Sequence, residues 1–84
     1  MEQTMAVTVL YYARLADKAG REQEKVTVAP QTTLPELYER LSRQYDFGCG
    51  YEDLEVIIND QFANWSDILM EGDSVAFMRP IAGG

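Results

Sequence analysis

The sequence predicts one small α+β domain, residues 1–84, in which a mixed β-sheet packs around one main helix. Its length of 84 residues is typical of a single domain. Short segments rich in β-branched and aromatic residues alternate with turn signals, whereas residues 33–45 repeat apolar side chains at helical spacing. The expected order is strand, strand, helix, strand, short strand and strand, followed by a flexible C-terminal tail over residues 79–84.

The composition argues against several classes of protein. The net charge is −7, from 14 acidic against 7 basic residues, so nucleic acid is not an expected partner. Such a charge favours partners with a basic surface, although it could serve solubility alone. The single cysteine excludes an internal disulfide, and no apolar run approaches the ~20 residues of a membrane-spanning helix. With no visible secretory signal, we expect a cytoplasmic protein without a membrane partner.

Residues 6–13 form the first expected strand, because they are rich in β-branched and aromatic side chains. Alternation gives this strand two faces, one with Val7, Val9 and Tyr11 and one with Thr8, Leu10 and Tyr12. Since both faces are partly apolar, the strand is expected at the centre of the sheet. A short helical turn over residues 14–19, ended by Gly20, leads to a second strand over residues 24–28, which pairs with the first.

Residues 33–45 form the predicted main helix. Thr33 and Glu36 have the spacing of a capping box, in which each side chain accepts a hydrogen bond from a free N–H at the helix start. Apolar side chains then recur on one face, namely Leu34, Leu37, Tyr38, Leu41 and Tyr45. We interpret this stripe as a core face rather than a cofactor site. Gly48 and Gly50 are expected to stop the helix.

Three further strands are expected, over residues 54–58, 61–63 and 74–78. Turn residues separate them, at positions 59–60 and 71–73. A short helical turn is expected over residues 65–69, in which Trp65 packs rather than binds a ligand. Cys49, between two glycines and away from cationic residues in the sequence, is not favoured as a sulfur acceptor.

The tail that follows the last strand has an unusual composition. Pro80 lacks an N–H and cannot continue sheet pairing. Because Gly83 and Gly84 lack a Cβ, the backbone there can enter a narrow channel. The one reactive group of the tail is the α-carboxylate of Gly84. These are the features required of a carboxylate that is presented to the active site of another protein.

The outer face of the sheet is the predicted docking surface. If Val75 and Phe77 point into the core, their neighbours on the strand point outward. The candidate interface residues are Leu10, Tyr12, Phe62, Ala76, Met78 and Arg79. An exposed group of Tyr, Phe and Met side chains is typical of an interface core. The alternative is that some of these side chains cover a small core.

Segments of this chain resemble the MoaD family, the small subunits of molybdopterin synthase. The resemblance is carried by Val9-Leu10-Tyr11-Tyr12-Ala13-Arg14-Leu15, by Val56-Ile57-Ile58-Asn59, and by residues 71–84 with their Glu71-Gly72-Asp73 turn and Gly83-Gly84 end. Arg79 departs from the family pattern, which usually has a proline there. The resemblance implies the β-grasp fold of ubiquitin-like proteins.

The resemblance also implies a sulfur-carrier chemistry. In the family, an enzyme of the ubiquitin-activating type adenylates the terminal carboxylate, and sulfur from a donor replaces the adenylate to give a thiocarboxylate. Carried over here, Gly84 is the covalent site with Gly83 beside it, and Pro80, Ile81 and Ala82 enter the large synthase subunit. Because the chain lacks histidine and a G-x-x-x-x-G-K-[ST] loop, ATP is expected only on the activating enzyme. Neither an intrinsic cofactor nor a metal is expected.

The family implies a heterotetramer of two small and two large subunits, in which sulfur passes to a cyclic pterin precursor of the molybdenum cofactor. This chain would then be the non-catalytic, sulfur-donating subunit. Three alternatives stay open from the sequence. They are a sulfur carrier of thiamine biosynthesis, a ubiquitin-like modifier that is joined through Gly84 to lysines of other proteins, and an interaction module whose tail has no covalent role.

Overall fold

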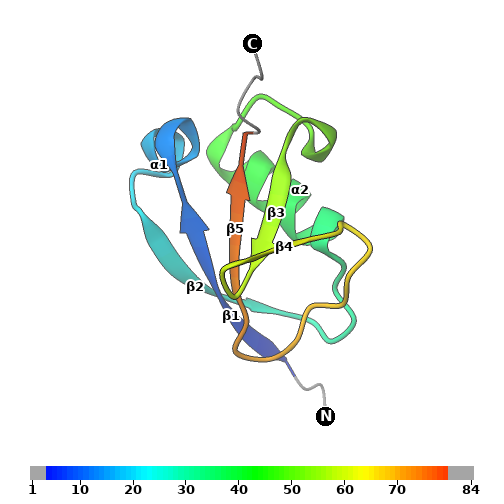
Figure 1. Ribbon diagram of the computed structural model, residues 1–84. Helices are drawn as coiled ribbons and strands as arrows, with labels where there is room; N and C mark the ends of the chain where they lie inside the picture. The colour runs from blue at the N-terminus through cyan, green and yellow to red at the C-terminus, as the bar shows by residue number, and fades with distance from the viewer. Residues whose placement is uncertain (1–3, 80–84) are drawn as a thin grey trace.

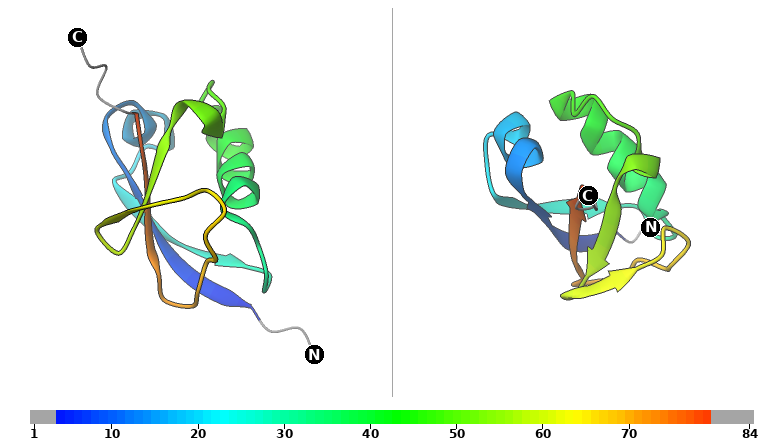
Figure 2. Two further views of the ribbon diagram at one scale, coloured as in Figure 1. Left: turned by 45° about the vertical axis from the view of Figure 1, so that its right-hand side comes forward. Right: turned by 45° about the horizontal axis from the view of Figure 1, so that its top comes forward.

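The computed structural model describes residues 4–79, which form a mixed β-sheet with one long helix across one face (Figures 1 and 2). The elements are β1 (Met5–Tyr11), α1 (Ala13–Ala19), β2 (Gln23–Val28), α2 (Leu34–Tyr45), the 3-10 helix η1 (Tyr51–Asp53), β3 (Glu55–Ile58), β4 (Gln61–Ala63) and β5 (Ser74–Met78). The sheet order is β2-β1-β5-β3-β4, with β1 and β5 parallel and the other neighbours antiparallel. The predicted α+β class is confirmed; η1 was not predicted.

β1 is an interior strand, paired with β2 on one side and with β5 on the other, as its two partly apolar faces predicted. The middle strand of the five is β5. Val7, Val9 and Tyr11 are at most 2% exposed, and they pack in the core beneath α2. The strand ends at Tyr11 because the backbone turns at Ala13, whose φ is 51°, and α1 begins there. The predicted end of α1 is confirmed, since Gly20 caps it with a left-handed φ of 73°.

The capping box predicted at the start of α2 is present. The Glu36 N–H donates to Thr33 Oγ1 at 3.2 Å, and the Thr33 N–H donates to Glu36 Oε1 at 2.9 Å. These bonds favour the ionised carboxylate and lower the pKa of Glu36. The helix ends before the predicted stop at Gly48, because Asp46 already adopts a left-handed φ of 58°. The apolar stripe of α2 is a core face, as predicted.

Aromatic side chains join α2 to the sheet. Trp65 stacks on Phe77 with ring centroids 5.6 Å apart, and Tyr38 meets the same ring edge-on at 5.2 Å. The indole N–H of Trp65 donates to the Leu54 carbonyl at 3.1 Å. The prediction that Trp65 is a packing residue is therefore confirmed.

The predicted helical turn over residues 65–69 is wrong. Asp67 closes a local turn instead: its N–H donates to the Asn64 carbonyl at 2.9 Å, and its side chain accepts from the Asn64 N–H at 3.1 Å. Ile68 then pairs with Thr33 in an antiparallel bridge. These contacts hold the segment against the start of α2.

Among residues 4–79, neither helix has the length and hydropathy required to span a bilayer.

Candidate functional site

The outer face of the sheet, on the side away from α2, carries an apolar row. The strand register places Leu10 beside Ala76, and Ala76 beside Ile57. Ile57 in turn lies beside Phe62. Because paired residues on neighbouring strands project to the same face, the row crosses β1, β5, β3 and β4. We define the docking face as this row together with the adjacent side chains: Leu10, Tyr12, Ile57, Phe62, Ala76 and Met78.

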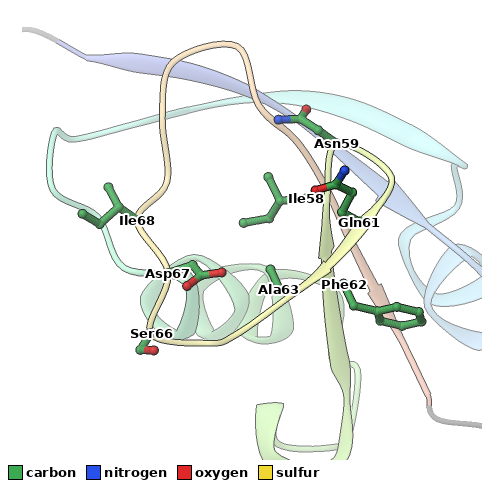
Figure 3. Close-up of a pocket in the computed structure, with 8 residues that line it drawn as sticks. All are labelled: Ile58, Asn59, Gln61, Phe62, Ala63, Ser66, Asp67 and Ile68. Atoms are coloured by element: carbon green, nitrogen blue, oxygen red, sulfur yellow. The ribbon is translucent and has the colours of Figure 1, made fainter.

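Two of the six side chains of the docking face are exposed to solvent, and three more are half-buried. Phe62 is 75% exposed and Tyr12 is 47% exposed, which places both among the most exposed large apolar side chains of residues 4–79. Leu10, Ile57 and Met78 are half-buried. Figure 3 shows Phe62 pointing away from the hollow into which Ile58 points, as alternation along the two strands requires.

Ala76 was expected to be exposed, and that expectation is wrong. It projects to the outer face but is only 2% exposed. It does not belong to the core cluster beneath α2, so it is covered from the outer side. The larger neighbours Leu10 and Ile57 flank its methyl group and screen it from water. Ala76 is thus the floor of the docking face rather than a contact on its surface.

The docking face leads to the root of the tail. Met78 ends β5, and the exposed Arg79 is the last described residue. A hollow of about 140 Å³ adjoins them, lined on its other sides by residues 12–15 and by Cys49. The predicted tail residues Pro80, Ile81, Ala82, Gly83 and Gly84 lie outside the described residues.

Cys49 lies at the tail root, where it lines the hollow together with Arg14 and Arg79. Its thiol Sγ is 3.3 Å from the hydroxyl of Tyr38, which also donates to the Cys49 carbonyl at 2.8 Å. Burial, and then the hydrogen bond to Cys49, raise the pKa of the Tyr38 phenol well above its ordinary value.

Glu24 joins three elements through its carboxylate. The hydroxyls of Tyr11 on β1 and Tyr45 on α2 both donate to Glu24 Oε2 at 2.6 Å, and Arg21 lies 3.3 Å from Oε1. Burial by itself would raise the pKa of this carboxyl, but the hydrogen bonds from the tyrosines outweigh it and lower the pKa. Burial and the same carboxylate raise the pKa of Tyr11. This cluster ties β2 to the core and is separate from the docking face.

The site is suited to binding and presentation. In the part of the chain that is described, no three His, Cys, Asp or Glu side chains are grouped to hold a metal ion. Sequence reasoning missed two of its residues. Ile57 could have been found by alternation along its strand, whereas nothing in the sequence placed Arg14 beside the tail root.

Comparison with known proteins places this arrangement among its relatives. The ThiS family matches residues 9–84. A molybdopterin synthase sulfur carrier subunit from Drosophila ananassae is 30% identical over 81 residues, covering 93% of this chain and 90% of the relative.

Solved structures share the fold. A Pyrococcus furiosus protein described as molybdopterin converting factor, subunit 1, superposes with a TM-score of 0.77 at 22% identity, covering 92% of this chain and 99% of the other. The small archaeal modifier SAMP1 from Haloferax volcanii superposes with a TM-score of 0.75 at 23% identity, covering 94% and 99%. A design based on ubiquitin also matches, with a TM-score of 0.61. The ubiquitin-like β-grasp fold predicted from the sequence is confirmed.

Proposed function

The chain belongs to the ThiS family, and from that premise we propose that it is the sulfur-carrying small subunit of a molybdopterin synthase. The observation that carries the proposal is that the family match extends to Gly84. The similarity to a relative named as a molybdopterin synthase sulfur carrier subunit favours this pathway over thiamine biosynthesis. The apolar docking face beside the tail root supports a role in which the domain binds a partner and delivers the tail.

The proposed chemistry takes place at the carboxylate of Gly84. A carboxylate is a poor acyl donor, so an activating enzyme first transfers AMP from ATP to a carboxylate oxygen, and pyrophosphate leaves. Sulfide supplied by a donor then attacks the acyl carbon, AMP leaves, and a thiocarboxylate remains. In the large synthase subunit the sulfur bonds to a cyclic pterin precursor, and water cleaves the acyl–sulfur bond and restores the Gly84 carboxylate. ATP binds only to the activating enzyme, and this chain needs no cofactor of its own.

The length of the tail limits how far the carboxylate can reach from the docking face. Five residues follow Arg79, and a chain rises at most ~3.3–3.6 Å per residue, so the acyl carbon can act no more than ~17 Å from the tail root. A partner that covers Met78 and Tyr12 therefore has its reactive centre within that distance. The same face would serve the activating enzyme and the large synthase subunit in turn, because each must bring the one tail into its own active site.

The direct test is reconstitution with a purified activating enzyme, ATP, a sulfur donor and the large synthase subunit. The wild-type chain should support conversion of the pterin precursor. A chain without Gly84, or one with an alanine added after it, should remain folded and support none. If the extended chain still supports conversion, the terminal carboxylate is not the sulfur carrier.

A protein modifier is the second candidate, favoured by the similarity of the fold to small archaeal modifier proteins. Both functions begin with adenylation of Gly84, and they differ in the nucleophile that follows. Lysine amines of target proteins would give isopeptides, whereas sulfur would give the thiocarboxylate. Isolation of isopeptide-linked conjugates that disappear with the loss of Gly84 would favour the modifier.

A further inference from the structure

A second apolar region lies at the end of the domain remote from the tail root. A groove of about 640 Å³ runs between Met5 at the start of β1, the residues that begin α2, and residues 65–70. We call it the far-end groove. Ile68 and Met70 border it and are 78% and 60% exposed, so two large apolar side chains are largely in water there. Figure 1 shows the starts of β1 and α2 at this end and the end of β5 at the opposite one.

Ile68 connects this groove to a neighbouring hollow. The hollow has a volume of about 650 Å³, and its lining includes Ile68, Ile58 and Phe62 (Figure 3). Residues 66–68 line both depressions and form a ridge between them. The ridge is held in place by the bridge between Ile68 and Thr33. Phe62 borders this hollow, while its ring lies on the docking face.

Four carboxylates lie in or next to the lining of the far-end groove. Asp67 is the only charged residue that lines it, and no Lys or Arg among the described residues does so. Three more carboxylates accept hydrogen bonds from backbone N–H groups in or next to its lining. These are Glu36 at Thr33, 2.9 Å, Asp73 at Met70, 2.9 Å, and Glu71 at Ala6, 3.2 Å. A second copy of the chain would bring the same negative rim against this one, so charge opposes self-association here.

We propose that the far-end groove binds an apolar segment of a partner protein, flanked by Lys or Arg residues. The apolar side chains of the segment would cover Ile68 and Met70, and its cations would meet the carboxylate rim. Binding there needs neither Gly84 nor the outer face of β5. The partner could therefore hold the carrier while the tail is inserted elsewhere.

The test uses the full-length ¹⁵N-labelled protein and two synthetic helical peptides. Both carry leucines on one face; the other face carries lysines in one peptide and glutamates in the other. The lysine peptide should shift the amide signals of Thr32 and residues 66–70 at low peptide concentration. The glutamate peptide should bind at least about tenfold more weakly, and added salt should reduce that difference.

Variants locate the binding. The double variant Ile68→Ser, Met70→Ser should bind the lysine peptide with an affinity about tenfold lower or more. Its melting temperature should not change, because both side chains are exposed. Met78→Ser, on the docking face, is the matched control and should leave this affinity unchanged. Equal binding of the two peptides, shifts confined to the docking face, or an unchanged affinity of the double variant would each overturn the proposal. Concentration-dependent shifts of residues 66–70 without peptide would also overturn it, since a second copy would then cover the groove.

Discussion

The two faces of β5 differ in what they contact, although the same alternation produced both. Val75 and Phe77 point toward α2 and are 0% exposed, whereas the half-buried Met78 points outward beside the exposed Tyr12. The inner side chains find partners within the domain. The outer ones are apolar without such partners, and they lie directly before the tail. A single strand of five residues thus packs into the core on one side and, in the proposed function, binds a partner on the other.

The largest expected effect on stability comes from the inner face. Phe77→Ala removes a ring that contacts Trp65 and Tyr38, and it should lower the free energy of unfolding by ~3–5 kcal/mol. That is a large part of the ~5–15 kcal/mol of a typical domain. Urea unfolding followed by Trp fluorescence measures it. A loss below ~1 kcal/mol would show that the ring is not part of a tightly packed core.

A smaller effect on stability is expected at the edge of the inner face, where Glu24 accepts hydrogen bonds from two tyrosine hydroxyls. Glu24→Gln keeps an acceptor but removes the charge, and it should cost ~1–2 kcal/mol at neutral pH. The folded-state pKa of Glu24 lies below its ordinary value of 4.5, so its carboxylate contributes stability above pH 4.5 that is lost as the pH falls through the folded-state pKa. Urea titrations at a series of acidic pH values should therefore give a shallower fall for the variant than for wild type.

Tyr45→Phe is the matched control for Glu24, since it removes one of the two donors and no charge. It should reproduce part of the loss at neutral pH. If Glu24→Gln and wild type lose stability in parallel as the pH falls, the lowered pKa of Glu24 is not the source of the acid sensitivity.

The N-terminal cap of α2 should contribute less to stability than the Glu24 carboxylate does. Thr33→Ala removes the hydroxyl that accepts from the Glu36 N–H and should cost about 1 kcal/mol, whereas Thr33→Ser should be nearly neutral because serine caps equally well. Chemical unfolding of the two variants separates the cap from the loss of a methyl group. Equal losses in both would assign the effect to packing rather than to the hydrogen bond.

The outer face should show the smallest change in stability and the largest change in binding. Because Met78 is half-buried, Met78→Asp should lower the free energy of unfolding by about 1 kcal/mol at most. In a complex, the same carboxylate would be desolvated without a partner at a cost of several kcal/mol, and 1.4 kcal/mol is already about tenfold in affinity. Calorimetry with the large synthase subunit and the activating enzyme, beside a melting curve, measures both. A collapsed melting temperature would mean that Met78 stabilises the core.

The sequence predicted those features that depend on near neighbours in the chain. Alternation along β1 and the Thr33–Glu36 box involve residues a few positions apart, and both are observed. The resemblance to the MoaD family rested on contiguous segments, and the family match over residues 9–84 supports it. These signals are local, so they can be read before the strands are paired.

Features that depend on strand register could not be predicted. The burial of Ala76 arises from the size of Leu10 and Ile57 on neighbouring strands, which no local pattern reports. The contacts of Glu24 with Tyr11 and Tyr45 join residues 13 and 21 positions apart. Residues 65–69 were expected to be helical, but Ile68 pairs instead with Thr33, which is distant in the sequence. Each of these needed the positions of strands or side chains that the sequence alone does not provide.

In the proposed function, the outer face of the sheet serves to deliver a sulfur-bearing C-terminus. The intact mass of the protein, purified from its own cells, tests it most directly. We expect a species in which one oxygen of the terminal carboxylate is replaced by sulfur, and we expect this species to be absent when Gly84 is deleted. A protein found only as the unmodified carboxylate while the cells are making the molybdenum cofactor, or only as isopeptide-linked conjugates, would contradict it.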